Sequence, residues 1–178
     1  HEIVLIKDRE YIHNEYIEIY QFREKVNEQY DIAGLYKIIF LTDESYIQLA
    51  IEIPKRGIGY VSPNPLVGCI IVKGDRILGA GYHEKYGENH AEINAVNSTK
   101  ENLEGTTLYV NLEPCSHFGK TPPCVDKIIE SKIKRVVIGT LDMNPLISGG
   151  GIKKLKAAGI EVKVGILEKE CIQLNKFF

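Results

Sequence analysis

The chain has 178 residues, which is enough for one well-packed domain with some to spare. Its 22 Lys and Arg residues nearly balance its 24 Asp and Glu residues, so that the formal net charge is −2. Because nucleic acids are bound largely through positive charge, this balance argues against a polynucleotide partner and leaves a small anionic substrate held by a local basic group.

Residues 1–42 have a different pattern from the rest of the chain. Two segments, IVLIK and LYKIIFL, are typical of strands, and EYIHNEYIEIYQFREKV between them has an approximate helical spacing of apolar residues. An added βαβ-like piece, the end of another domain and a packing extension are all compatible with this pattern. We therefore treat residues 1–42 as an N-terminal extension of unknown role and residues 43–178 as the main domain.

The main domain is predicted to begin with a helix, DESYIQLAIEI, over residues 43–53. Asp43 has a side chain suited to the N-cap, and Pro54 should end or kink the helix. The apolar face of this helix is expected to carry Tyr46, Leu49, Ala50 and Ile53.

Strands and helices alternate along the remainder. VGCIIV and RILGAGY predict two strands joined by the turn Lys73-Gly74-Asp75, and a helix carrying His90 follows. TLYVNL is a predicted strand, and CVDKIIESK predicts a helix that begins just after a proline. The last elements are the strand RVVIGTL, the helix GIKKLKAAG, the strand EVKVGI and the helix LEKECIQLNKFF. Because helices separate the strands, the predicted fold is α/β, a three-layer αβα arrangement with a mainly parallel mixed sheet.

Three candidate metal ligands lie in short motifs: His90 in His90-Ala91-Glu92, and then Cys115 and Cys124, each directly after a proline. An imidazole and two thiolates fill three corners of a tetrahedron around Zn²⁺, and a catalytic zinc keeps the fourth corner open for water. Two thiolates also cancel the charge of the ion and weaken it as a Lewis acid, so a nearby base would help to remove a proton from water. The pattern predicts a hydrolytic zinc site, with both thiolates near helix N-terminal ends that favour negative charge.

Glu92 is the candidate base. On a helix that begins near His90, a residue two positions later sits about 200° around the axis, so Glu92 does not share a simple metal-binding face with His90. A proton shuttle at the helix N-terminus fits better. His-x-Glu followed by Pro-Cys-x-x-Cys is the signature of zinc deaminases, in which the glutamate is the general acid and base. The competing interpretation is a non-catalytic, zinc-stabilised module that binds a partner.

The match to this signature is not literal, because eight residues, SHFGKTPP, separate Cys115 from Cys124 where the common form has two. This spacing, with PNPLVGCIIV, HAE, LEPCSHFGKTPPC and the Asn144-Pro145 turn, resembles the riboflavin-biosynthesis pyrimidine deaminases (diaminohydroxyphosphoribosylaminopyrimidine deaminases) of the cytidine deaminase-like superfamily. The resemblance runs from about Ser45 to Phe178. It implies the three-layer αβα fold of that superfamily, in agreement with the predicted elements.

The resemblance implies a zinc-dependent hydrolase that removes the C2 amino group of 2,5-diamino-6-ribosylamino-4(3H)-pyrimidinone 5′-phosphate as ammonia, leaving 5-amino-6-ribosylaminouracil 5′-phosphate. His90, Cys115 and Cys124 would hold the zinc, and Glu92 would move the proton from water to the leaving amine. The alternative is a deaminase of another nucleotide, a nucleoside or a tRNA adenosine, against which the eight-residue insert and the near-neutral charge argue. Many relatives continue into an NADPH-dependent reductase domain. Since this chain stops at Phe178, we expect no reductase activity in it and a reductase only as a separate or removed domain.

The resemblance also assigns substrate contacts. Asn64, between two prolines, looks like the pyrimidine-binding asparagine of deaminases, with an Asx turn in its own loop as the alternative. His83 matches a pocket position of the family, although an exposed loop histidine fits the sequence nearly as well. His117 and Lys120 lie on the loop that the metal would tether at both ends, and Lys120 would meet a carbonyl or phosphate oxygen. A metal-ligand role for His117 and a solvated Lys120 are the alternatives.

Asp142 and Asn144 follow the strand RVVIGTL, at the carboxyl edge where open α/β sheets bind ligands, and would suit ribose hydroxyls or a phosphate. A capping or turn role is the alternative. Here the chain departs from the family, with Met143 where a proline is usual and Gly150 where a basic residue often follows the glycine. Backbone N–H groups in SGGG could supply an anion nest for the phosphate instead.

The cysteines and the apolar pattern also bear on location. Cys69 and Cys171 lie in apolar segments and are predicted to be core residues, so the cysteine usage is typical of a reducing compartment. No apolar run approaches the length of a transmembrane helix, and the charged start HEIVLIKDRE lacks the apolar region of a signal peptide. We expect a cytoplasmic protein that binds neither membrane nor nucleic acid and that forms a homo-oligomer.

Overall fold

The computed structural model describes residues 8–11, 18–21, 42–119, 122–142, 144 and 148–176. The chain divides into two compact units, residues 1–41 and residues 42–178. No helix in the described ranges is long and apolar enough to cross a membrane.

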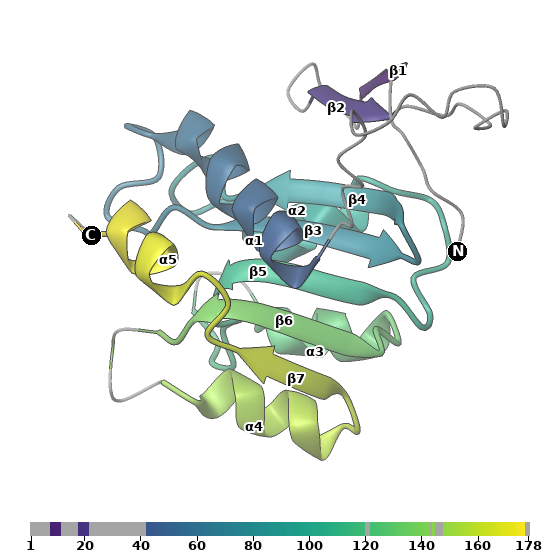
Figure 1. Cartoon of the computed structure of the whole chain (residues 1–178). Helices are drawn as coiled ribbons and strands as arrows, with labels where there is room; N and C mark the ends of the chain where they lie inside the picture. Colours follow the sequence, from purple (N-terminus) through teal and green to yellow (C-terminus); the bar gives the residue numbers. More distant parts are fainter. Residues whose placement is uncertain are drawn as a thin grey trace, which may run out of the picture. The chain divides into compact units, whose positions relative to one another are not determined.

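In the first unit, two short strands pair as an antiparallel ribbon (Figure 1). They are β1 (Asp8–Tyr11) and β2 (Glu18–Gln21), with Asp8 opposite Gln21. The predicted helical pattern of EYIHNEYIEIYQFREKV is therefore wrong at Glu10 and Tyr11, which end β1, and over Glu18–Gln21, where isoleucine and tyrosine favour a strand. The two predicted strands IVLIK and LYKIIFL lie outside the described residues.

The second unit is built on a five-stranded mixed sheet with the order β4-β3-β5-β6-β7 (Figure 1). β3 pairs antiparallel with β4 and with β5, whereas β5, β6 and β7 are parallel to one another. Among these five described strands, β3 runs against the other four, which confirms the predicted mainly parallel mixed sheet. The strands are β3 (Gly68–Lys73), β4 (Arg76–Tyr82), β5 (Thr107–Leu112), β6 (Arg135–Thr140) and β7 (Glu161–Val164).

Helices cover both faces of this sheet and complete the predicted three layers (Figure 1). α1 and α5 pack on one face, and α2, α3 and α4 pack on the other. Both faces of the central strands are buried, so these strands are nearly continuous apolar runs. Cys69 and Cys171 are fully buried, as predicted. The helices are α1 (Asp43–Glu52), α2 (Ala91–Asn97), α3 (Cys124–Glu130), α4 (Gly150–Ala157) and α5 (Glu168–Leu174).

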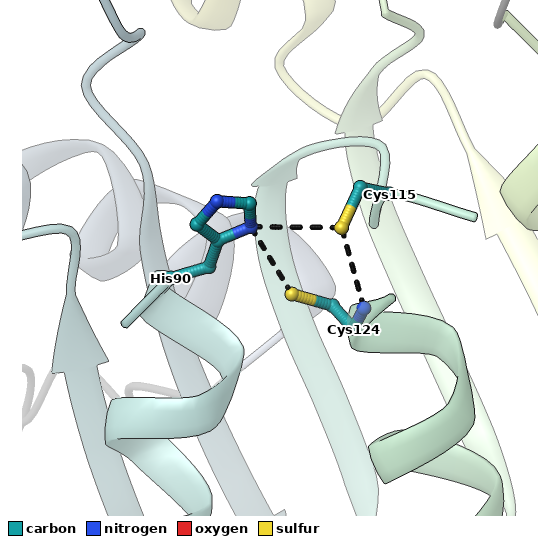
Figure 2. Close-up of side chains that lie close together, drawn as sticks. All are labelled: His90, Cys115 and Cys124. Carbon is teal, nitrogen blue, oxygen red and sulfur yellow. Dashed lines mark hydrogen bonds between the residues drawn. The ribbon is translucent and has the colours of Figure 1, made fainter. Parts of the chain in front are cut away.

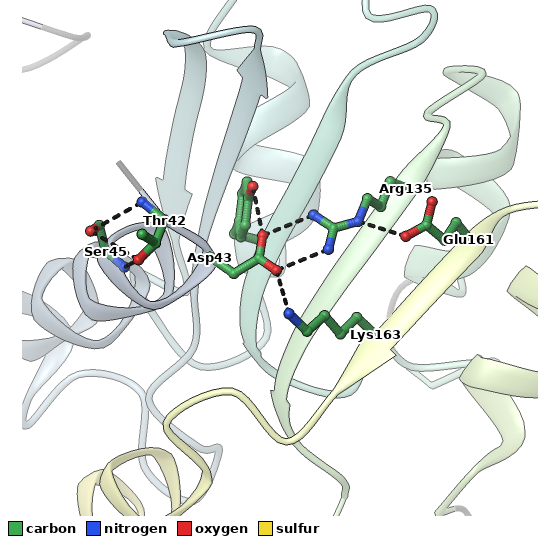
Figure 3. A network of polar contacts seen from close by, with 7 residues as sticks. Thr42, Asp43, Ser45, Arg135, Glu161 and Lys163 are labelled. Carbon is green, nitrogen blue, oxygen red and sulfur yellow. Dashed lines mark hydrogen bonds and ion pairs between the residues drawn. The ribbon is translucent and has the colours of Figure 1, made fainter. Parts of the chain in front are cut away.

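The start of α1 differs from the prediction by one residue. Thr42, not Asp43, is the N-cap, and it forms a reciprocal capping box with Ser45 (Figure 3). Asp43 instead bonds across the sheet to Arg135 and Lys163, which are stronger partners for a carboxylate than a backbone N–H. The helix ends at Glu52, and Pro54 lies in the following 3₁₀ helix, Ile53–Gly57.

The buried face of α1 is also rotated from the predicted one. Leu49 is only partly buried, whereas Ile47 and Ile51 on the neighbouring side of the helix are buried. The residues that α1 buries are Tyr46, Ile47, Ala50 and Ile51, and the predicted Ile53 is buried just beyond the helix.

Asp43 ties α1 to the sheet (Figure 3). Its Oδ1 accepts hydrogen bonds from Arg135 Nη1 at 2.8 Å and from the Tyr109 hydroxyl at 3.1 Å. Its Oδ2 accepts from Arg135 Nη2 at 2.9 Å and from Lys163 Nζ at 2.8 Å. One carboxylate thus connects the helix to β5, β6 and β7.

Asp43→Asn should lower the free energy of unfolding at neutral pH by about 1–3 kcal/mol, because it removes charge-assisted hydrogen bonds. The hydrogen bonds from Arg135 are the main cause that holds the pKa of Asp43 well below its ordinary value of 3.8. A carboxyl with a depressed folded-state pKa stabilises the fold above its unfolded-state pKa and loses that contribution as the pH falls through its folded-state pKa. In urea unfolding, the difference from wild type should be full at neutral pH and shrink below about pH 4.

Glu161→Gln is the matched control for this prediction. Glu161 is exposed and accepts one hydrogen bond from Arg135 Nε at 2.8 Å, so its variant should unfold close to wild type. Equal unfolding midpoints for wild type and Asp43→Asn at neutral pH would contradict the role assigned to Asp43.

Candidate metal and active site

The predicted metal ligands come from three segments that meet at one edge of the sheet (Figure 2). His90 is the N-cap of α2, Cys115 lies in the loop after β5, and Cys124 is the first residue of α3. β5 and β6 are parallel, so the loops that follow them emerge at the same edge. β4 ends there as well, and β3 begins there, since β3 is antiparallel to both of its neighbours.

The spacing of the three side chains fits a tetrahedral zinc ion. His90 Nδ1 lies 3.5 Å from Cys115 Sγ and 3.3 Å from Cys124 Sγ, and all three ligand atoms lie within 4.8 Å of one another. Zinc–nitrogen and zinc–sulfur bonds of about 2.0–2.3 Å at tetrahedral angles place nitrogen and sulfur about 3.6 Å apart. The donors present therefore match zinc in type and in distance.

Both thiolates lie at the N-terminal end of α3, as predicted. Cys124 is the first residue of that helix, and its backbone N–H donates to Cys115 Sγ at 3.3 Å. The hydrogen bond from the Cys124 thiol, and then that from His90, lower the pKa of Cys115, and the resulting Cys115 thiolate raises the pKa of Cys124. The site thus holds one thiolate readily, and a bound divalent cation would supply the charge that stabilises the second.

Glu92 lies in the first turn of α2, two residues after His90, and its side chain is buried. Burial, followed by the negative charge of Cys115, raises the pKa of Glu92 to about 7. Glu92 does not belong to the group of potential ligands that the described residues form. A buried carboxyl whose pKa lies near neutrality, beside but outside a metal site, can both accept and return a proton.

His83 is buried, and not the exposed loop residue that was the alternative. Its Nδ1 lies 2.9 Å from the carbonyl oxygen of Asn89, and its Nε2 lies 3.1 Å from Asn64 Nδ2. Because a carbonyl only accepts, Nδ1 carries the proton, and Nε2 of the neutral ring accepts from the Asn64 amide. This pairing orients Asn64 so that its Oδ1 is the atom that can accept a hydrogen bond from a ligand.

The loop that carries Asn64 is held by two buried asparagines that the sequence analysis missed. Asn111 accepts from Gly68 N at 2.8 Å and donates to the carbonyl of Leu66 at 2.9 Å. Asn175 accepts from Leu66 N at 2.8 Å. The sequence did contain a signal for Asn111, a polar residue inside the apolar strand TLYVNL. A buried polar side chain needs a hydrogen-bond partner, so its position indicated a structural role.

His117 and Asp142 line a small pocket beside Cys115, together with Glu113, Pro114 and Ser116. His117 is exposed and is not part of the ligand group, so its alternative role as a metal ligand finds no support among the described residues. Lys120 and Met143 lie outside the described residues.

Asp142 and Asn144 form a local turn, in which Asp142 Oδ1 accepts from Asn144 N at 2.8 Å. This is the turn role that was the alternative for the pair. It engages one carboxylate oxygen of Asp142, while Asp142 still lines the pocket.

Glu113 is a buried carboxylate that the sequence analysis did not single out. It accepts hydrogen bonds from the backbone N–H groups of Asp142, Gly149, Gly151 and Ile152. Two of these donors, Gly149 and Gly151, belong to SGGG, so their N–H groups are not free to form the suggested anion nest for phosphate. The carboxylate of Glu113 occupies the position that a bound anion would take.

Comparisons with known proteins agree with this geometry. Residues 41–140 match the family model of the cytidine and deoxycytidylate deaminase zinc-binding region. The riboflavin biosynthesis protein RibD of Aquifex aeolicus is 55% identical over 136 residues, which cover 76% of this chain and 38% of that protein. The diaminohydroxyphosphoribosylamino-pyrimidine deaminase of Buchnera aphidicola subsp. Schizaphis graminum is 53% identical over 138 residues, which cover 78% of this chain and 94% of that protein.

Solved structures show the same likeness. Acinetobacter baumannii RibD is similar with a TM-score of 0.75 and 47% identity, covering 76% of this chain and 38% of that one. The chain therefore spans 38% of these RibD relatives and 94% of the Buchnera deaminase.

Proposed function

The chain belongs to the zinc-binding cytidine and deoxycytidylate deaminase family, among the pyrimidine deaminases of riboflavin biosynthesis, and we propose that it deaminates the diaminopyrimidine intermediate of that route. The substrate is 2,5-diamino-6-ribosylamino-4(3H)-pyrimidinone 5′-phosphate, and the products are 5-amino-6-ribosylaminouracil 5′-phosphate and ammonia. The observation that carries the proposal is the tetrahedral spacing of His90, Cys115 and Cys124 beside the buried carboxyl of Glu92.

The proposed mechanism divides the work between the metal ligands and Glu92. Zinc, when held by His90, Cys115 and Cys124, supplies a Lewis acid that makes water a better nucleophile. Glu92 takes a proton from water as the water oxygen bonds to the amidine-like C2 of the pyrimidine. Glu92 then returns the proton to the exocyclic nitrogen, the carbon–nitrogen bond breaks, and ammonia leaves. The raised pKa of Glu92 suits both transfers, because each needs a group that is neither a strong acid nor a strong base.

The substrate contacts stay proposals. Asn64 would accept a hydrogen bond from the pyrimidine through Oδ1, with His83 holding the amide in place. His117 lies beside Cys115 on the pocket wall, where a substrate oxygen or ring edge would approach. Lys120 would meet a carbonyl or phosphate oxygen. Asp142 and Asn144 would meet the ribose or its phosphate at the end of β6, beside the pocket that Asp142 lines.

Asn64→Ala should keep its zinc and lose about 10- to 100-fold in kcat/KM, because the pyrimidine loses a hydrogen-bond acceptor in a partly buried site. The measurement is ammonia release from the diaminopyrimidine, with zinc content determined on the same sample. Asn102→Ala is the matched control, since Asn102 is exposed and contacts only the nearby backbone of Glu104 in the bonds described. An Asn64→Ala enzyme within twofold of wild type would remove Asn64 from the site.

A substrate comparison tests the proposed function. The zinc-loaded chain should release ammonia from the riboflavin intermediate with a higher kcat/KM than from deoxycytidylate or from a tRNA adenosine. Preference for either of the last two would replace the proposal with another deaminase activity. Full zinc content without ammonia release from any of them would favour a non-catalytic, zinc-stabilised module.

The RibD relatives extend well beyond the matched region, and their further activities are not carried over to this chain. Cytoplasmic location and homo-oligomer formation likewise stay predictions. A reducing compartment would keep the cysteine thiols of the site available for metal.

A further inference from the structure

Glu113 is buried, yet each of its carboxylate oxygens accepts two backbone hydrogen bonds. Oε2 accepts from Asp142 N at 3.3 Å and from Gly149 N at 2.9 Å, on the loop after β6. Oε1 accepts from Gly151 N at 3.0 Å and from Ile152 N at 3.4 Å, in the first turn of α4. The partners described for this carboxylate are all backbone groups, so its charge is stabilised by N–H dipoles and the helix N-terminus.

Close packing accompanies these hydrogen bonds. A Cβ atom at Gly151 would collide with the carbonyl oxygen of Pro114, and one at Gly150 would lie 2.7 Å from Ser116 Oγ. The start of α4 is therefore pressed against the segment that carries Cys115. At positions 150 and 151, only a residue without a side chain lets the start of α4 come this close.

Glu113 lies between the segment that carries Cys115 and the loop that carries Asp142 and Asn144. Glu113 comes two residues before the metal ligand Cys115, and the loop that it holds carries Asp142 and Asn144. Asp142 lines the same pocket as Cys115 and His117. A displacement of this loop would move Asp142 and Asn144 while leaving His90 and Glu92 at the start of α2 and Cys124 at the start of α3.

We propose that Glu113 is a positioning residue for substrate: its carboxylate fixes Asp142 and the start of α4 against the segment that carries Cys115, and so sets substrate affinity. This inference rests on the proposed deaminase function. It also implies that the substrate phosphate is recognised elsewhere than by the N–H groups of Gly149 and Gly151, which the protein itself occupies.

Glu113→Gln is the variant that tests the inference, because it keeps the size of the side chain and replaces one acceptor oxygen with a donor. The variant should bind one zinc per chain and keep kcat within about twofold, while KM rises about 10- to 100-fold, as expected for the loss of charge-assisted hydrogen bonds. Hydrogen exchange at the Gly149 and Gly151 amides should become faster. Glu104→Gln, which removes an exposed carboxylate paired with Lys132, should change none of these quantities.

Each outcome decides for or against the positioning role. The role would be overturned by a KM that stays unchanged, whether or not kcat falls. Unchanged amide exchange would also overturn it, and so would loss of zinc from a folded Glu113→Gln protein. If Glu113→Gln does not fold, Glu113→Asp replaces it, since that variant keeps the charge but is too short to reach both sets of N–H groups, and the same criteria apply. Amide exchange needs no substrate, so a wild-type chain that fails to deaminate the diaminopyrimidine would reject the proposed function while exchange still decides whether Glu113 holds the loop.

Discussion

Glu92→Gln is expected to bind zinc as the wild type does and to lose at least roughly 10²–10⁴-fold in kcat, the usual contribution of general acid–base catalysis. Glutamine preserves the shape of the buried side chain, but its amide neither takes a proton from water nor gives one to the leaving amine. Because Glu92 lies outside the ligand group, its replacement should leave the metal in place. Zinc analysis and ammonia release on the same preparation separate the two effects.

Glu130→Gln is the control for this variant, since Glu130 lies exposed at the end of α3 and pairs only with Lys127 among the ion pairs described. It should retain both zinc and activity. A Glu92→Gln enzyme that turns over near the wild-type rate would show that another group moves the proton, and the proposed mechanism would be wrong.

The second large effect is expected from replacing either of the two candidate cysteine ligands. Wild type should hold about one zinc per chain, and Cys115→Ala or Cys124→Ala should lose both metal and activity, because two protein ligands rarely retain zinc where three hold it in catalytic sites. Cys171→Ala is the matched control: Cys171 is also buried, but it lies in α5 outside the ligand group, and its replacement should lower stability while leaving the zinc content unchanged. Full zinc occupancy in either ligand variant would refute the assignment.

The prediction of the ligand set and of the sheet rested on signals that are local in sequence. His90, Cys115 and Cys124 each lie in a short motif, and a metal that needs all three requires their segments to meet. The apolar runs of β3, β5 and β6 likewise identify buried strands without reference to any other part of the chain. The structure assembles these elements into the three-layer fold with a mainly parallel mixed sheet that the alternation of helices and strands predicts.

The features that the sequence analysis missed depend on partners far along the chain. Asp43 is a reasonable N-cap by local rules, but its carboxylate meets Arg135, 92 residues away, and Thr42 takes the cap. Glu113 meets backbone N–H groups 29 to 39 residues later, and a backbone donor leaves no mark in the sequence. For the same reason the SGGG segment resembled a free anion site, although the N–H groups of Gly149 and Gly151 already bond to Glu113.

The burial of His83 likewise could not be predicted from the sequence near it. Histidine is found both on loops and in protein interiors, so its residue type does not decide between them. Its environment depends on Asn64 and on the carbonyl of Asn89, which come from the loop before β3 and from the segment before α2. Only the fold places these groups on either side of one imidazole ring.

The most direct test of the central claim is the reaction of the zinc-loaded chain with the diaminopyrimidine phosphate in water enriched in the heavy oxygen isotope, with ammonia and product measured together. Hydrolytic deamination predicts one ammonia for each product molecule, one solvent-derived oxygen at C2 of the product, and loss of both when a chelator removes the metal. Ammonia release that leaves C2 unlabelled, or turnover that persists after the metal is removed, would contradict zinc-dependent hydrolysis.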